Sequence, residues 1–96
     1  MSDKAKLEWD AKKAVEYLRK HGVSFDDAAT AFADPLSITV SDPDHSVDEH
    51  RFVLVGRSLR AGVVVVVHAD RGDNVRIISA RLATPREVRK HEQAEP

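Results

Sequence analysis

The sequence predicts an α+β fold in which two N-terminal helices precede a small antiparallel β-sheet and one further helix ends the chain. Apolar residues recur at helical spacing in the first third of the chain, and the spacing changes to two from Leu36 onward. A third signal is the stretch "TPRE" from Thr84, which is typical of a helix start. Ninety-six residues in this order indicate a single α+β domain, residues 1–96, with one modest core.

The first helix is predicted to follow a short edge strand between Lys4 and Trp9. Asp10 is a suitable N-cap, and Gly22 suits the position just after a helix, where the backbone turns left-handed. Between them, four apolar or small residues share one helical face: Ala11, Ala14, Val15 and Leu18. We predict that this face packs against the sheet.

A second helix is predicted to begin after Ser24, with Asp27 three residues on as in a capping box. Its apolar stripe comprises Phe25, Ala28, Ala29 and Phe32. Asp34 and Pro35 then stop the helix, because the residue before a proline avoids the helical region.

Strands occupy the next part of the chain. Apolar and polar residues alternate over Leu36–Ser41, which indicates a half-buried strand. The polar stretch "SDPDHSVDEH" is predicted to be a loop, and "RFVLVGRS" a second strand. The run "VVVVVHA" is predicted to be central and covered on both faces, since it would promote aggregation at an exposed edge. A turn with Gly72 at positive φ leads into "VRIISARLA". Thr84 and Pro85 then start the last helix, and residues 92–96 are expected to fray.

The last predicted strand carries two arginines five positions apart, Arg76 and Arg81. In a regular strand their side chains would point to opposite faces of the sheet. Either only one of them belongs to a site, or a β-bulge re-aims one of them. If they diverge, Arg81 is free to pair with an acid such as Asp10 or Glu87.

Composition excludes several classes of protein. The chain has no cysteine, which rules out disulfides and thiolate metal sites, and no spacing of histidines typical of a metal site. It lacks a phosphate-binding glycine loop, a nucleophile elbow, a signal peptide and a membrane-length apolar segment, so we expect a cytoplasmic protein without metal or other cofactor. The net charge is −1, yet eight of the nine arginines lie at or beyond position 51.

Three polar groups are candidates for a site. They are His45, Glu49 and Arg51 in "HSVDEHR", His68 with Arg71, and Arg76 with Arg81; Lys20 and His21 end the first helix and are possible neighbours. Histidine or glutamate with arginines suffices to cleave RNA, whose own 2′-hydroxyl is the nucleophile. The same residues equally allow structural roles: His45 and Glu49 as loop caps, and His68 as a satisfied, semi-buried histidine.

Four strings carry a resemblance to a known family. "LEWDAKKA", "KHGVSFDDAATAFADP", "DPDHSVDEHRFVLVGRS" and "RIISARLATPRE" resemble, in order and spacing, the BrnT toxins of type II toxin–antitoxin systems. The resemblance covers about residues 7–92. It implies a fold like that of RelE ribonucleases and a cofactor-free, intracellular endoribonuclease that inhibits translation. It also implies that a BrnA-like ribbon-helix-helix antitoxin neutralises the toxin. The toxin would then be associated with operator DNA only indirectly, through this antitoxin.

The resemblance also suggests site residues. It implies that at least one of Arg76 and Arg81 faces RNA. We predict that both contact phosphate or stabilise the transition state, with His45, Glu49 and Arg51 nearby and His45 or Glu49 as base. We assign substrate binding to four further residues: Lys20, His21, His68 and Arg71.

The chain departs from the family pattern at Ala61-Gly62, at Tyr17 and at His91, where the family often has a tyrosine. His91 either replaces that tyrosine as proton donor or is an exposed tail residue. The alternatives to a toxin are a catalytically degenerate member that binds antitoxin as a corepressor, and an unrelated α+β interaction domain.

Overall fold

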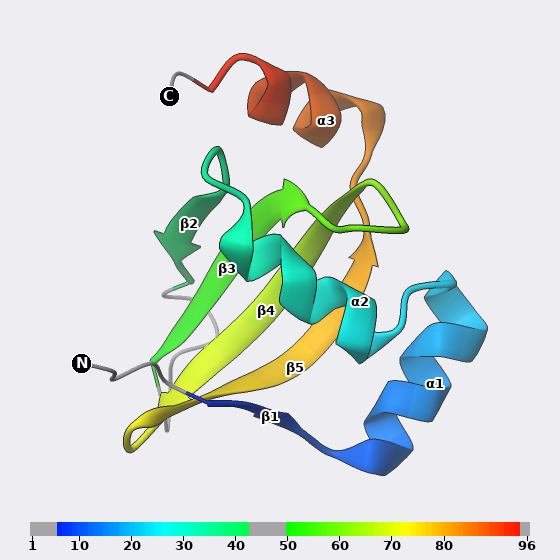
Figure 1. Ribbon diagram of the computed structural model, residues 1–96, viewed down its shortest axis with the longest axis vertical. Helices are drawn as coiled ribbons and strands as arrows, with labels where there is room; N and C mark the ends of the chain where they lie inside the picture. The colour runs from blue at the N-terminus through cyan, green and yellow to red at the C-terminus, as the bar shows by residue number, and fades with distance from the viewer. Residues whose placement is uncertain (1–5, 43–49, 95–96) are drawn as a thin grey trace.

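A computed structural model describes residues 6–42 and 50–94 as a five-stranded sheet with three α-helices and one 3₁₀ helix (Figure 1). The strands are β1 (Leu7–Trp9), β2 (Ile38–Ser41), β3 (Arg51–Arg57), β4 (Val63–Arg71) and β5 (Asn74–Leu82). The helices are α1 (Ala11–His21), α2 (Phe25–Thr30), the 3₁₀ helix η1 (Ala31–Ala33) and α3 (Pro85–Glu92). The predicted α+β class is thereby confirmed.

The sheet has the strand order β1-β5-β4-β3-β2. The valine strand β4 lies at its centre, as predicted, and its neighbours β3 and β5 run antiparallel to it. The prediction of a wholly antiparallel sheet is wrong, because β1 pairs in parallel with β5. A parallel neighbour is possible here because α1 and the rest of the chain separate the two strands in sequence.

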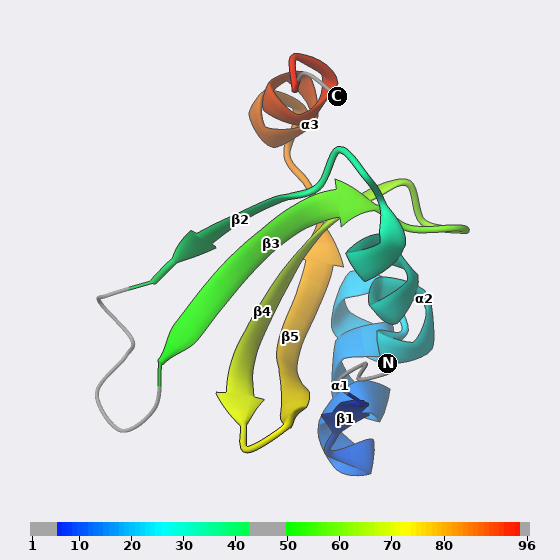
Figure 2. The same ribbon diagram turned by 60° about the vertical axis from the view of Figure 1, so that its left-hand side comes forward.

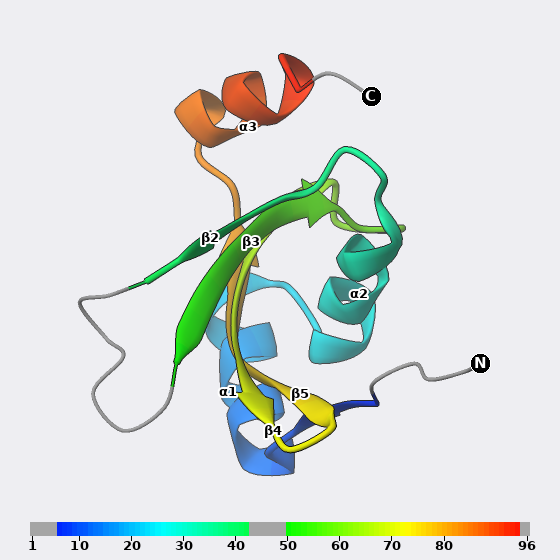
Figure 3. The ribbon, with the colours of Figure 1, turned by 90° about the vertical axis from the view of Figure 1, so that its left-hand side faces the viewer.

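Helix α2 covers one face of the sheet, and α1 lies alongside β5 (Figures 1 and 3). The opposite face, which we call the open face, points away from α2. Figure 2 shows α3 beyond the end of the sheet, and it shows β2 at the outer edge of the sheet.

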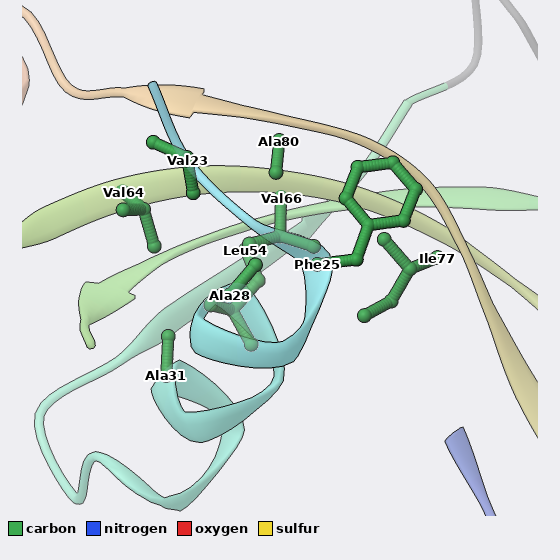
Figure 4. Close-up of a cluster of buried hydrophobic side chains, with 9 residues drawn as sticks. All are labelled: Val23, Phe25, Ala28, Ala31, Leu54, Val64, Val66, Ile77 and Ala80. Atoms are coloured by element: carbon green, nitrogen blue, oxygen red, sulfur yellow. The ribbon is translucent and has the colours of Figure 1, made fainter. Parts of the chain in front are cut away.

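The core lies between α2 and the sheet (Figure 4). Ala28 and Ala31 are fully buried, and their small side chains allow the helix backbone to approach the strands. A Cβ at Gly56 would come within 3.0 Å of the Ala31 carbonyl oxygen, so this glycine permits the same close approach on β3. The core side chains come from α2, its neighbouring turns and three strands: Val23, Phe25, Ala28, Ala31, Leu54, Val64, Val66, Ile77 and Ala80.

The predicted caps are confirmed, but the predicted buried face of α1 is not. Asp10 accepts the N–H groups of Lys12 and Lys13, and Gly22 has a φ of 72°. Val15 and Leu18, however, are exposed, whereas Ala14 and Tyr17 pack against the core. The Tyr17 side of α1 faces the core, and the Val15 side faces solvent, because the ring of Tyr17 packs on that of Phe25. The strand β2 is also more exposed than predicted along its whole length.

Candidate functional site

A β-bulge in β5 determines where the two arginines point. The pairing of β4 with β5 shifts between Val67 and His68, which leaves Ile78 as an extra residue on β5. Arg76 and Arg81 therefore lie on the same face, the open face, instead of on opposite faces. The bulge that the arginine spacing allowed as an alternative is thereby confirmed.

Two arginines on the open face flank one alanine. Arg51 on β3 and Arg76 on β5 are both register partners of Ala69 on β4. Neighbouring strands lie about 4.8 Å apart, so the two arginine Cα atoms are separated by about 10 Å. Ala69 is fully buried although its side chain points to this face, so the longer neighbouring side chains cover it. This row of three residues, which we call the arginine row, allows two guanidinium groups to reach one phosphate.

Acidic groups lie next to Arg76. Its Nη1 is 3.7 Å from Glu8 Oε2, and Asn74 Nδ2 donates to Glu8 Oε1 at 3.0 Å. Arg76 also contributes to the low pKa of Asp10, which results mainly from the backbone N–H groups that this carboxylate accepts. Glu8 could not be predicted as a site residue from the sequence, because only the parallel pairing of β1 with β5 brings it to Arg76.

Arg81 makes a closer ion pair. Its two terminal nitrogens donate to the Glu87 carboxylate at 2.9 and 3.0 Å, a bidentate contact that joins β5 to α3. This contact, with help from the N–H of Thr84, lowers the pKa of Glu87 to about 2. Arg81 is the partner of Val65, four residues along β4 from the arginine row, a distance of about 13 Å. The geometry favours the structural alternative for Arg81.

His91 is not an exposed tail residue, and that prediction is wrong. It is 3% exposed, and its Nε2 lies 2.7 Å from Asp34 Oδ2. The same carboxylate accepts the N–H groups of Leu36 and Arg57. The pair thereby fixes the end of α3 to the segment between η1 and β2.

His68 lies on the α2 side of the sheet, within a row of rings. The centroid of its ring lies 5.0 Å from that of Phe32 and 5.6 Å from that of Phe52. The ring of His50 stacks on that of Phe52 with 4.6 Å between their centroids. His68 is buried, and no described residue forms a hydrogen bond with either ring nitrogen. The prediction of a satisfied histidine is therefore wrong, and the residue lies on the opposite face from the arginine row.

Acid is expected to destabilise the protein through His68. Burial lowers the pKa of His68, and the nearby Asp70 only partly opposes this. The neutral histidine therefore contributes fully to the free energy of unfolding above its unfolded pKa of about 6.5. Below that pH the free energy of unfolding falls by up to about 1.4 kcal/mol per pH unit, until the folded pKa is reached. Urea denaturation at pH 7.5 and 5.5 should show a smaller loss for His68→Phe than for wild type. The exposed control His21→Gln should behave as wild type, and equal losses in all three proteins would contradict this role.

Three of the other predicted residues are not brought to the arginine row. Lys20 and His21 are exposed at the end of α1, with His21 stacked on Tyr17, and Arg71 is exposed at the end of β4. His45 and Glu49 lie outside the described residues. In the sequence they lie five positions and one position before His50, whose Nε2 is 2.7 Å from Ser41 Oγ.

Two further classes of feature are missing from residues 6–42 and 50–94. No three His, Asp or Glu side chains there gather closely enough to hold a metal ion. None of the helices in these residues has the length and apolar character needed to cross a bilayer.

Comparison with known proteins identifies the family. Residues 9–87 match the sequence model of the ribonuclease toxin BrnT of type II toxin–antitoxin systems. The chain belongs to the BrnT family. A crystal structure of the Brucella abortus ribonuclease toxin BrnT has a similar fold, with a TM-score of 0.61 and 21% sequence identity. The similarity covers 84% of this chain and 99% of the Brucella chain. None of the curated proteins matches the sequence.

Proposed function

We propose that this BrnT-family chain is a cofactor-free endoribonuclease and that the arginine row binds the scissile phosphate of RNA. The observation that carries the proposal is the placement of Arg51 and Arg76 on either side of the small Ala69. Two permanently charged, planar groups suit the oxygens of a phosphate that gains negative charge in the transition state.

The proposed reaction needs no group beyond the protein and the RNA. The 2′-oxygen attacks phosphorus as a base removes its proton, and the bond from phosphorus to the 5′-oxygen breaks as that oxygen is protonated. The products are a 2′,3′-cyclic phosphate and a free 5′-hydroxyl. Arg51 and Arg76 stabilise the crowded phosphorane, and we assign the base to His45 or Glu49, which precede Arg51 in the sequence.

We extend the proposal to the biological setting. The toxin acts in the cytoplasm, inhibits translation and resembles RelE ribonucleases in fold. A BrnA-like ribbon-helix-helix antitoxin neutralises it and contacts operator DNA on behalf of the complex. The family's membership of type II toxin–antitoxin systems supports an antitoxin partner and an RNA substrate.

A second function, that of a degenerate member that only binds antitoxin, is favoured by one observation. Arg76 and Arg81 each face a carboxylate, Glu8 and Glu87, and the whole chain carries a net charge of −1. Such a surface attracts RNA less than a basic one would. The two functions differ in catalysis alone.

Cleavage of a purified mRNA in EDTA distinguishes them. We expect the wild-type protein to cut RNA without added metal and to leave 2′,3′-cyclic phosphate ends. An otherwise identical substrate with 2′-deoxy residues at the cut sites should stay intact, because it lacks the nucleophile. If the folded protein leaves RNA intact even with ribosomes present, the degenerate function is favoured instead.

A further inference from the structure

The outer edge of the sheet leaves main-chain groups available for pairing. No described strand lies beyond β2 in the sheet order. The N–H of Asp42 donates to the carbonyl of Arg51 at 2.9 Å, so this residue points its main-chain groups toward β3. Antiparallel pairs alternate between bonded and non-bonded positions, and the main-chain groups of Thr39 and Ser41 therefore point outward.

This edge lacks the usual protection against pairing. Strands at sheet edges commonly carry lysine, proline or a bulge, which discourage a further strand. The sequence of β2, "ITVS", has no charged residue and no proline, and its pairing with β3 is regular over all four residues. The opposite edge is formed by β1, which is only three residues long and carries Glu8 at its centre.

An apolar groove runs beside this edge on the open face, between the sheet and α3. Its volume is about 290 Å³. The floor is formed by aliphatic side chains of β2 and β3, and the wall by residues of α3: Ile38, Val40, Val53, Val55, Glu87, Lys90 and His91. Ile38 and Val40 remain substantially exposed although they are β-branched apolar residues.

The charges around the groove indicate the chemistry of its occupant. Arg86, Arg89 and Lys90 are exposed on α3, whereas Glu87 is already paired with Arg81. Lys90 lines the groove, and Arg86 and Arg89 are exposed on the same helix. An aliphatic floor beside these cations suits a peptide that has apolar side chains and acidic flanks. It does not suit RNA, whose bases stack on aromatic side chains.

We infer that an extended, acidic segment of the antitoxin pairs with the edge of β2 and places apolar side chains in the groove. The inference rests on the proposed function for the existence of that partner, and it adds where and how the partner binds. Main-chain hydrogen bonds to Thr39 and Ser41 would provide affinity, and the groove would select alternate side chains of the added strand.

Two variants test the two parts of this interface, with a purified BrnA-like antitoxin as probe. Thr39→Pro removes an outward N–H, and proline is tolerated at such an edge position. Val40→Lys places a charge on the floor of the groove. The matched controls are Ala11→Pro, at the first residue of α1 where proline is also tolerated, and Val15→Lys, at another exposed valine.

We expect each interface variant to bind the antitoxin at least tenfold more weakly in calorimetric titration, with both controls within twofold of wild type. Circular dichroism should show the same fold in all five proteins, and RNA cleavage should be unchanged. Unchanged antitoxin binding by the folded variants would overturn the inference and leave the proposed ribonuclease intact.

Two other outcomes identify other occupants and equally overturn the inference. A wild-type dimer that Thr39→Pro makes monomeric, with antitoxin binding retained, would assign the edge to a second copy of this chain. Slower RNA cleavage by Val40→Lys with normal antitoxin binding would assign the groove to RNA. Wild-type protein that binds the antitoxin through β2 but never cuts RNA would contradict the proposed catalysis alone.

Discussion

Alanine at Arg76 is expected to reduce the rate of RNA cleavage about 100-fold, the effect of removing one charge-stabilising donor from a transition state. Arg51→Ala is expected to reduce it to a similar extent, because the two arginines flank Ala69 and we propose that both bind the same phosphate. Single-turnover cleavage of a labelled RNA with saturating protein measures the effect. Arg19→Ala, which removes an exposed charge from α1, is the matched control and should cut as wild type does.

The double variant tests whether the two arginines act together. If both contact one phosphate, Arg51→Ala with Arg76→Ala should cost less than the product of the single effects. Multiplicative effects would instead indicate two separate phosphate contacts. Full activity of Arg76→Ala would rule out the arginine row as the site.

Arg81→Ala is expected to differ from these variants. Its ion pair with Glu87 is partly exposed, with 44% of the Arg81 side chain accessible, so the loss of stability should be about 1 kcal/mol or less. The pair joins β5 to α3 and lies away from the arginine row, and we expect the cleavage rate to change less than tenfold. A loss of activity equal to that of Arg76→Ala would restore Arg81 to the site.

The helix boundaries could be predicted because their signals are local. The caps at Asp10, Gly22 and Thr84 each involve residues within four positions, and all are found where the sequence places them. The central position of the valine strand was also predictable, since five consecutive valines need cover on both faces. These features depend on backbone geometry that neighbouring residues determine.

The features that the sequence could not provide depend on distant residues. Glu8 reaches Arg76 only through a parallel strand pair, and Asp34 meets His91 across 57 positions. The five-residue spacing allowed the arginines to lie on opposite faces of a regular strand or on one face of a bulged strand. Only the register of β5 against β4 shows that the strand has the bulge. The candidate site was therefore predictable as a set of residue types but not as a geometry.

Asp27 shows how a local signal can be correct and still incomplete. Its N–H donates to Ser24 Oγ, as a capping box requires, but its carboxylate does not turn back to Ser24. It accepts instead from Ser58 Oγ at 2.7 Å and from the N–H groups of Arg60 and Ala61 at 2.9 Å each. One carboxylate from α2 thereby holds the turn between β3 and β4.

Asp27→Ala is consequently expected to lower the free energy of unfolding by about 3 kcal/mol, because it leaves buried donors such as Ser58 Oγ without this acceptor. Asp27→Asn keeps one carbonyl oxygen and should lose about half as much. Asp26→Ala, an exposed neighbour in the same turn of α2, is the matched control and should lose less than about 1 kcal/mol. Urea denaturation at pH 7 measures all three.

The pH dependence gives a second test of the same carboxylate. Burial alone would raise the pKa of Asp27, but the hydrogen bonds from Ser58, Ala61 and Arg60 outweigh it and hold the pKa below the usual 3.8. A depressed pKa stabilises the fold above the unfolded value and ceases to do so as the pH falls through the folded value. The difference in stability between wild type and Asp27→Ala should therefore be constant near neutrality and shrink below about pH 4. A difference that persists unchanged at lower pH would mean that packing, and not the ionised carboxylate, is what Asp27 contributes to the turn.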